Sequence, residues 1–350
     1  GYSSSQEYRQ VKKMVDNSEK ILEVKDLNVT FHARGQEIRA VRGVSFDVCP
    51  GEILGIVGES GSGKSVTMKA VLGILPENAS IRAESLKLGH TEMTKISQEE
   101  YRKLRGTQMT MIFQDPMTAL DPVMTVGKHM EEVLRRNGGL KSKEEIRARS
   151  IEMLDKVGIP DPASRLKQYP HEFSGGMRQR VLIAMALACN PKMLIADEPT
   201  TALDVTIQAQ ILDLLQELEE QYHTSIVLIT HDMGVVATVC QRVAIMYGGL
   251  IMETGTSDEI FYDPKHPYTK ALLRAIPSTE LKEGERLQAI EGLPPSLVNP
   301  PAGCPFAERC EYASDLCRRQ LPEYQEFSGT HRAMCHLYEG QGRRSGKEAD

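Results

Sequence analysis

Hydrophobic residues follow two different patterns near the start of the chain. Residues 21–31 (ILEVKDLNVTF) alternate apolar and polar side chains, and residues 41–48 (VRGVSFDV) do so loosely. Such alternation predicts half-buried strands. Residues 53–57 (ILGIV), in contrast, are apolar throughout and predict a strand with both faces buried.

Three further apolar runs, at residues 109–113, 193–196 and 225–229, predict buried strands, and each is followed at once by polar residues. Residues 205–222, between the last two runs, predict a helix because their apolar side chains share one face. These side chains are Ile207, Ile211, Leu214, Leu215 and Leu218. The alternation of strands and helices predicts an α/β fold with ligands at the carboxyl ends of the strands.

Local differences in composition divide the chain into segments. Residues 1–20 are polar and predict a flexible N-terminal segment, and residues 21–260 form the main domain. Within it, residues from about 116 to 175 are charged and helical, which predicts a helical subdomain. Residues 261–339 contain a proline-rich path and most of the cysteines, and form a C-terminal extension. Residues 340–350 predict a disordered tail.

Composition narrows the class of protein. The chain has 350 residues, of which 40% are hydrophobic and 26% charged, and its net charge is -6. These values exclude collagen, a coiled coil and whole-chain disorder. The acidic balance provides no general attraction to nucleic acid. The longest strongly apolar stretch, Val181–Cys189, is far shorter than the ~20 residues that span a bilayer.

Residues 58–65 (GESGSGKS) fit the phosphate-binding pattern G-x-x-x-x-G-K-[ST] between a predicted strand and a predicted helix. The glycines let backbone N–H groups converge on phosphate oxygens, and the helix adds the positive end of its dipole. Lys64 then reaches the β- and γ-phosphates, and the hydroxyl of Ser65 binds Mg²⁺. The residues that we expect to contact the nucleotide here are Gly58, Ser60, Gly61, Ser62, Gly63, Lys64, Ser65 and Val66.

Polar side chains follow three of the predicted strands. Asp197 and Glu198 end one strand, Gln114 follows a second, and His231 follows a third. Taken alone, an Asp-Glu pair after a strand is usually a solvated strand end. Together with the phosphate loop, Asp197 is suited to hold Mg²⁺, and Glu198 is suited to polarise an attacking water molecule. Gln114 and His231 are placed to approach the γ-phosphate.

With these residues the sequence resembles the ATP-binding-cassette (ABC) ATPases. Residues 173–180 (FSGGMRQR) resemble the family's signature motif, although Phe173 and Met177 replace its usual leucine and glutamine, and residues 197–204 (DEPTTALD) resemble its second acidic motif and D-loop. The resemblance implies a P-loop core with an antiparallel β subdomain and a helical subdomain. It also implies that Gln114 binds Mg²⁺ and that His231 is the switch histidine.

The same resemblance implies contacts with ATP outside the phosphate loop. Phe31 would stack on adenine, with His32 as the alternative. In a head-to-tail dimer the signature residues of one subunit reach the nucleotide of the other, and the intact serine-glycine-glycine core leads us to expect this function to survive. The residues concerned are Ser174, Gly175, Gly176 and, in the D-loop, Asp204.

Three segments resemble the ATPase subunits of bacterial oligopeptide or dipeptide permeases: residues 264–277 (PKHPYTKALLRAIP), 292–297 (GLPPSL) and 303–310 (GCPFAERC). This resemblance implies a peripheral subunit at the cytoplasmic face of the membrane. Its partners would be a second, non-identical ATPase subunit, two transmembrane permease subunits and, indirectly, an extracytoplasmic peptide-binding protein, with no nucleic acid. The alternatives are an importer of nickel or another small solute, a soluble ABC ATPase without a transport role, and a regulatory module that binds ATP without hydrolysing it.

Four of the seven cysteines lie near the C-terminus, in the order Cys304, Cys310, Cys317 and Cys335. Their spacing, C-x₅-C-x₆-C-x₁₇-C, differs from that of zinc knuckles and of the ferredoxin run. Such a crowd favours metal binding over disulfides. The permease resemblance favours a [4Fe–4S] cluster over Zn²⁺, and unligated thiols are a third possibility. His331 and His336 flank Cys335, and we expect both in solvent rather than among the ligands.

Overall fold

The computed structural model describes residues 20–33, 35–200, 204–276 and 290–339. Residues 1–19 of the predicted flexible segment and the predicted tail lie outside the described residues. The chain divides into two compact units. Unit 1 comprises Gly1–Asp47, Leu54–Thr94 and Thr230–Asp350, and unit 2 comprises Val48–Ile53 and Lys95–Ile229. The domain limits drawn from the sequence stay predictions.

Unit 1 contains a mainly antiparallel sheet in the order β2-β1-β5-β6, with β4 also paired to β1. Its strands are β1 (Leu22–Ala33), β2 (Gln36–Val48), β4 (Ala79–Arg82), β5 (Ser85–Leu88) and β6 (Thr91–Glu92). In β1 the buried positions Leu22 and Val24 are followed, after one extra residue, by Leu27 and Val29. The shift falls at Asp26, whose φ of 48° interrupts the regular strand. The predicted half-buried strands are confirmed.

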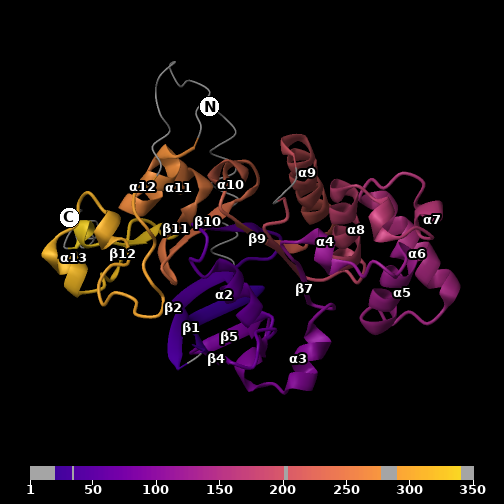
Figure 1. Cartoon of the computed structure of the whole chain (residues 1–350), viewed down its shortest axis with the longest axis horizontal. Coiled ribbons are helices and arrows are strands. Elements are labelled where there is room, and N and C mark those ends of the chain that lie inside the picture. Colours follow the sequence, from indigo (N-terminus) through magenta and orange to yellow (C-terminus); the bar gives the residue numbers. More distant parts are fainter. Residues whose placement is uncertain (1–19, 34, 201–203, 277–289, 340–350) are drawn as a thin grey trace, which may run out of the picture. The chain divides into compact units, whose positions relative to one another are not determined.

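The second sheet of unit 1 has the order β12-β13-β11-β10-β3, in which β3 and β10 are parallel and the other pairs antiparallel. Its strands are β3 (Ile53–Val57), β10 (Arg242–Tyr247), β11 (Leu250–Thr256), β12 (Tyr324–Glu326) and β13 (Arg332–Met334). The helices of unit 1 are α2 (Lys64–Val71), α10 (Met233–Val239), α11 (Ser257–Tyr262), α12 (Pro267–Arg274) and α13 (Asp315–Arg319). Helix α11 packs against α10, β10 and β11 (Figure 1).

Unit 2 is built on three parallel strands in the order β9-β8-β7, namely β9 (Ser225–Thr230), β8 (Met193–Asp197) and β7 (Met109–Ile112). Every residue of β8 is buried. The helices of this unit are α3 (Gln98–Leu104), α4 (Pro116–Ala119), α5 (Val126–Arg136), α6 (Lys143–Lys156), α7 (Pro162–Arg165), α8 (Gly175–Leu187) and α9 (Val205–Tyr222). Helices α4, α5 and α6 pack against α8, and α7 packs against α6 (Figure 1). The predicted α/β class and the predicted helix over residues 205–222 are confirmed.

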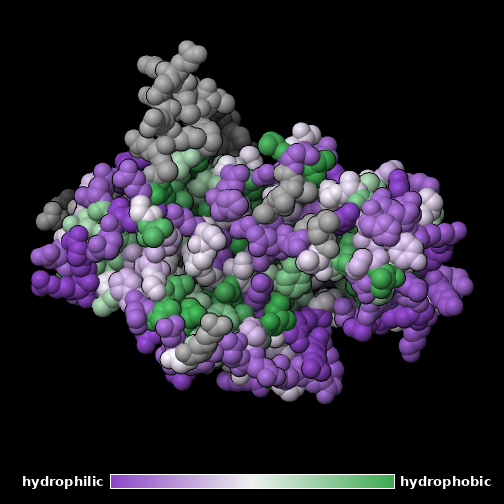
Figure 2. Space-filling model, viewed as in Figure 1, coloured by the Kyte–Doolittle hydropathy of each residue, from purple (hydrophilic) through white to green (hydrophobic). Residues whose placement is uncertain are grey.

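The surface in Figure 2 is mainly hydrophilic, and its apolar side chains are scattered among polar ones. Single exposed apolar residues such as Val205 and Tyr262 are ordinary on a protein surface. Within the described residues, no helix has the length and apolar character that a bilayer-spanning segment requires.

Candidate functional site

The phosphate loop of unit 1 connects β3 to α2. Two of its glycines are required by close backbone contacts, since a Cβ atom on Gly58 would lie 2.0 Å from the carbonyl oxygen of Met246 and one on Gly63 would lie 2.5 Å from that of Ala40. Both also have positive φ angles, of 159° and 102°. Residue 58 follows β3 directly, so the loop starts at the carboxyl end of a buried strand. The sequence motif therefore has the backbone that its chemistry needs.

Lys64 lies inside this loop with its ammonium group on backbone oxygens. Its Nζ donates to the carbonyl oxygens of Gly58, at 2.7 Å, and Glu59, at 2.9 Å. Only 5% of the residue is exposed. A buried ammonium among carbonyl dipoles provides a preformed cationic site for an anion. Ser60 and Gly61 are exposed at the tip of the loop, whereas Ser62 is buried and Ser65 and Val66 are partly exposed.

Two carboxylates end β8 in unit 2, at the same edge as the end of β7. Ile112 of β7 lies beside Ala196 of β8 in the parallel register, so the residues that follow both strands meet. Asp197 is 2% exposed, and Glu198 is partly exposed. The side-chain amide of Gln114 donates to Oε2 of Glu198 at 2.9 Å. The structure thus brings together two of the residues that the sequence singled out.

Glu198 has a left-handed backbone, with a φ of 46°. This conformation is uncommon for a residue with a Cβ atom and is a form of local strain. The N–H of Glu198 donates to the carbonyl oxygen of Ile229 in β9, at 2.9 Å, and this bond holds the turn in place. The positive φ places a turn directly after Asp197, the last residue of β8.

Two helices of unit 2 begin at predicted site residues. Ser174 is the N-cap of α8 and accepts a hydrogen bond from the N–H of Met177 at 3.3 Å, and Asp204 caps α9 by accepting from Ile207 at 2.9 Å. Gly176 packs so closely on Ile207 that a Cβ atom would lie 2.7 Å from that side chain. Ser174 and Gly175 are exposed at the positive end of a 13-residue helix.

The remaining predicted nucleotide contacts lie in unit 1. Phe31 is partly buried in β1, and the exposed His32 forms a hydrogen bond through Nε2 with Ser80 Oγ at 2.6 Å. His231 is exposed directly after β9 and before Asp232, the N-cap of α10. The roles of these residues toward a nucleotide stay predictions.

Comparison with known proteins decides the family. Residues 41–201 match the ABC transporter family, and residues 252–317 match the C-terminal region of oligopeptide/dipeptide transporters. The chain is 54% identical, over 89% of its length and 87% of the relative's, to the oligopeptide transport ATP-binding protein OppD of Bacillus subtilis. The chain belongs to the ABC transporter ATPases. The resemblance inferred from the sequence is confirmed.

Other relatives and solved structures agree with this assignment. The chain is 52% identical to the dipeptide transport ATP-binding protein DppD of Bacillus subtilis, over 91% of this chain and 95% of that one. An ATP-binding cassette solved as a dimer in a post-hydrolysis state, with ADP and Pi bound, matches with a TM-score of 0.60 and 28% identity. This match covers 67% of the present chain and 98% of the solved one. The ABC ATPase fold expected from the motifs is confirmed.

In the C-terminal region of this ABC ATPase, all four clustered cysteines line one pocket together with His266 and His336. The N–H of Cys304 donates to the carbonyl oxygen of Cys317 at 2.8 Å, which joins two of the cysteine-bearing segments. Burial, followed by the neighbouring thiols, raises the pKa of Cys304 to about 12. Burial likewise raises the pKa of Cys335 to about 11. These thiols are protonated at neutral pH unless a cation binds them.

His266 contributes an unsatisfied donor to the same pocket. Its Nδ1 accepts a hydrogen bond from the N–H of Tyr268 at 3.0 Å and caps α12. The ring is neutral, because burial lowers the pKa of His266 to about 4, so its proton is on Nε2. Nε2 is buried and has no hydrogen-bond partner within the part of the chain that the structure describes. The sequence analysis included His266 only as part of the segment 264–277 and did not connect it with the cysteines, because its position 38 residues before Cys304 gives no sign of proximity.

The expectation that His331 and His336 are solvated is wrong. His331 is 2% exposed, and its Nε2 lies 2.7 Å from Oε1 of the fully buried Glu253. His336 contacts Glu339 through Nδ1 and the carbonyl oxygen of Gln320 through Nε2. Both imidazoles therefore have structural partners, which flanking positions in the sequence do not reveal.

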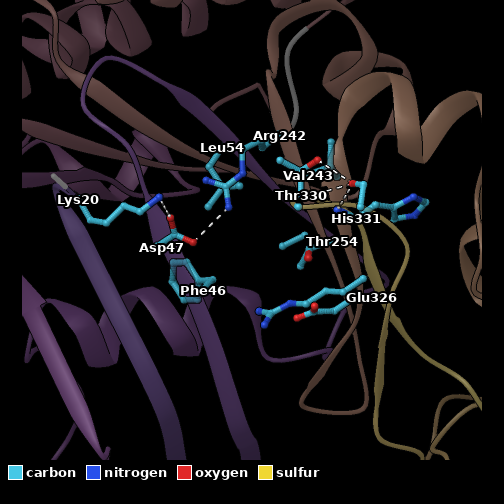
Figure 3. A pocket seen from close by; sticks show the side chains of 14 residues that line it. Lys20, Phe46, Asp47, Leu54, Arg242, Val243, Thr254, Glu326, Thr330 and His331 are labelled. Atoms are coloured by element: carbon cyan, nitrogen blue, oxygen red, sulfur yellow. Dashed lines mark hydrogen bonds and ion pairs between the residues drawn. The ribbon is translucent and has the colours of Figure 1, made fainter. Parts of the chain in front are cut away.

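A second pocket, in unit 1, is lined by charged side chains of opposite sign that form ion pairs with one another (Figure 3). The carboxylate of Asp47 lies 2.7 Å from Lys20 and 3.2 Å from Arg242. Burial would raise the pKa of Asp47, but Arg242 and Lys20 outweigh it and hold that pKa below its ordinary value. None of the predicted site residues lines this pocket. We interpret its ion pairs as structural.

Proposed function

We propose that this chain is the ATP-hydrolysing subunit of a bacterial ABC importer for oligopeptides or dipeptides. The observation that carries this proposal is the peptide-transporter C-terminal region on the same chain as an intact ATPase motif set. Relatives with this arrangement are named as oligopeptide and dipeptide transport ATP-binding proteins. The chain would act at the cytoplasmic face of the membrane as a peripheral subunit.

The substrate is MgATP, and the phosphate loop supplies its principal binding site. Lys64 exchanges the carbonyl oxygens of Gly58 and Glu59 for β- and γ-phosphate oxygens, and the loop's N–H groups bind the same phosphates. Ser65, Asp197 and Gln114 would supply oxygen ligands for Mg²⁺, and such oxygen atoms are the ligands that this ion prefers. Phe31 or His32 would stack on adenine.

Glu198 is the group that activates water. Its carboxylate accepts a hydrogen bond from Gln114 through one oxygen, Oε2, and this bond fixes the orientation of the carboxylate. In this role the carboxylate would take or polarise a proton of the attacking water. His231 holds the γ-phosphate and stabilises the charge that develops there.

Replacement of Glu198 by glutamine tests this role. The Glu198→Gln variant should bind MgATP normally, because glutamine is isosteric, and should lose about 10²–10⁴ of the turnover, because the base is absent. Steady-state ATPase rates and equilibrium binding of ATP measure the two effects separately. An unchanged turnover rate would exclude Glu198 from this role.

Hydrolysis requires two ATPase subunits arranged head to tail. Ser174 and Gly175 are exposed at the start of α8, where they would be available to a γ-phosphate held by a partner. We propose a non-identical ATPase partner and two transmembrane permease subunits, with cargo delivered by an extracytoplasmic peptide-binding protein. Purification of the complex after co-expression of these subunits tests the set of partners.

Cargo is tested on the reconstituted complex. Peptide-loaded binding protein should stimulate ATP turnover and drive peptide uptake into vesicles, whereas nickel or another small solute should do neither. Stimulation by nickel instead of peptide would assign the chain to the small-solute importers. An ATPase that never associates with permease subunits would assign it to the soluble cassette proteins.

We further propose that the four-cysteine pocket holds a [4Fe–4S] cluster. Cys304, Cys310, Cys317 and Cys335 supply four sulfur ligands, and the orphaned Nε2–H of His266 suits an electron-rich, anionic occupant. Among the described residues, no group of three or more His, Cys, Asp or Glu side chains is placed to hold a metal ion. The proposal therefore rests on the pocket that the four cysteines share and on the resemblance to the peptide-permease ATPases.

A bound cluster would supply a structural crosslink between the cysteine-bearing segments, with redox capacity. Anaerobically prepared protein should be brown and contain four irons and four sulfides per chain, the composition of the cluster. Colourless protein with one zinc per chain would replace the cluster by Zn²⁺. Metal-free protein of full stability would leave the cysteines as unligated thiols.

A further inference from the structure

Glu59, the second residue of the phosphate loop, has its side chain bound by the C-terminal extension. Arg309 donates from Nη1 to Oε2 of Glu59 at 2.6 Å and from Nη2 to Oε1 at 3.0 Å. The two residues are 250 positions apart in the sequence. Parallel hydrogen bonds between a guanidinium and a carboxylate fix both the distance and the orientation of the pair.

The backbone of Glu59 is bound by the same extension. The N–H of Glu59 donates to the hydroxyl of Tyr268 at 2.9 Å. Tyr268 is fully buried, and its ring packs on those of Tyr247, with centroids 4.5 Å apart, and Phe306, with centroids 5.2 Å apart. An aromatic cluster of this kind leaves the hydroxyl oxygen little freedom, so the position of residue 59 is fixed relative to it.

The other polar atom of the Glu59 backbone faces the phosphate site. Its carbonyl oxygen accepts hydrogen bonds from Nζ of Lys64, at 2.9 Å, and from the N–H of Ser62, at 3.2 Å. Residue 59 therefore contacts the extension through its side chain and N–H, and the phosphate-binding groups through its carbonyl. A displacement of Glu59 would move the lysine and the loop together.

Arg309 is fully engaged by this arrangement. Its side chain is 4% exposed. Besides Glu59, it donates to the hydroxyl of Tyr247 and to the carbonyl oxygens of Ile290 and Glu291, at distances from 2.8 to 3.0 Å. The bonds to Glu59 are the largest cause of the raised pKa of Arg309. A buried guanidinium with every nitrogen bonded is held rigidly and is costly to move.

We propose that Arg309 and Tyr268 are positioning residues that hold the phosphate loop in its nucleotide-binding conformation through Glu59. The inference rests on the proposed binding of MgATP by this loop. Ser60 and Gly61, which follow Glu59, are exposed, so the loop needs anchoring at its start. Because Arg309 directly precedes Cys310, its side chain attaches a cysteine-bearing segment to the phosphate loop.

A double-mutant cycle on the full chain tests the pair. Glu59→Gln and Arg309→Gln should each weaken binding of a non-hydrolysable MgATP analogue by about fivefold. The first leaves the buried Arg309 guanidinium poorly paired, and the second leaves the partly exposed Glu59 carboxylate poorly paired. The double variant should bind no more weakly than either single variant, because the two substitutions remove the same contact. Arg318→Gln is the control, because Arg318 lies in the same extension and, among the described residues, forms its ion pair with the exposed Glu308.

The Tyr268→Phe variant is a second test of the positioning role, and it preserves the packing of the ring. It removes only the hydroxyl that accepts from Glu59, and it should weaken analogue binding by about threefold while leaving the unfolding temperature nearly unchanged. Two outcomes would overturn the positioning role. One is that the losses of analogue affinity caused by Glu59→Gln and Arg309→Gln add in the double variant. The other is that the variants lose stability without any change in analogue affinity. Failure of the unsubstituted chain to bind the analogue would instead overturn the proposed ATPase function.

Discussion

Residues at the proposed catalytic centre have conformations that their neighbours in the fold impose. Glu198 takes a left-handed backbone because its N–H must reach the carbonyl oxygen of Ile229 while its carboxylate reaches Gln114. The sequence motif predicted the identity of this residue as a base. It could not predict the φ angle, because the partner that holds the turn is on another strand. Strain at such a position is consistent with selection for function over stability.

The orphaned donor of His266 leads to a prediction at the residue scale. In the chain loaded with iron and sulfide, His266→Asn should lower the ratio of reduced to oxidised cluster, at fixed potential, by about fivefold. An N–H···S hydrogen bond stabilises the reduced cluster more than the oxidised one, because the reduced cluster is more negative. Loss of this bond therefore disfavours reduction. Asparagine keeps the cap on α12, so the fold is retained. Anaerobic redox titration followed by electron paramagnetic resonance measures the ratio.

The matched variants separate hydrogen bonding from packing. His266→Gln places an amide N–H near the original Nε2 and should restore much of the ratio. His336→Asn, at a histidine of the same pocket whose nitrogens already have partners, should leave it unchanged. Equal shifts in the asparagine and glutamine variants at residue 266 would contradict a role for the donor.

The contacts that sequence reasoning missed are those between distant residues. The pair of Arg309 and Glu59 spans 250 positions, and the pair of His331 and Glu253 spans 78. No motif or periodicity in the sequence indicates that the two residues of either pair are partners. The phosphate loop, in contrast, could be predicted because its chemistry resides in eight contiguous residues.

At the scale of elements, helix starts coincide with the predicted signature residues. Ser174 is the N-cap of α8 and Asp204 is the N-cap of α9. The side chains that would approach a nucleotide therefore also fix where these helices begin. The bounds of α9 were predictable, because a cap precedes a long apolar stripe. The short helix α4 and the strands β12 and β13 were not predicted, since elements of three or four residues show no measurable period.

Helix α11 provides a prediction about stability. Burial would raise the pKa of Glu259, but hydrogen bonds from Ser328, the N–H of Thr256 and Thr330 outweigh it and lower that pKa. A carboxylate whose pKa is lower in the folded state stabilises the folded protein at pH values above its unfolded-state pKa, near 4.3. This contribution disappears as the pH falls through the folded-state pKa. Glu259→Gln should therefore cost about 1–2 kcal/mol at pH 7 and progressively less below pH 4.3.

Urea denaturation at neutral and acidic pH measures this difference. Asp258→Asn is the control, because Asp258 is an exposed carboxylate in the same first turn of α11. It should change stability by no more than a few tenths of a kcal/mol at either pH. A cost of Glu259→Gln that stays constant down to the lowest pH would show that the carboxylate charge is not involved.

At the scale of the whole molecule, each compact unit is assembled from separated segments of the chain. Unit 2 includes residues 48–53 far from the rest of its sequence, and unit 1 unites three segments. Hydropathy patterns describe neighbours along the chain, so they predicted β1, β2, β3, β7, β8 and β9 but not the other strands, nor which unit each strand joins. The family resemblance, which rests on motifs from both units, supplied the architecture instead.

The proposed head-to-tail arrangement leads to a prediction about the signature segment. Ser174→Asp keeps a good N-cap on α8, since aspartate and serine cap equally well, but it directs a negative charge at the γ-phosphate held by the partner subunit. In the complex with the second ATPase and the permease subunits, turnover should fall about a hundredfold. The affinity of the isolated chain for MgATP should stay the same, because its own phosphate loop is intact. Ser142→Asp, the same substitution at the N-cap of α6, should leave both quantities unchanged. Normal turnover with aspartate at residue 174 would contradict a signature segment that acts on the partner's nucleotide.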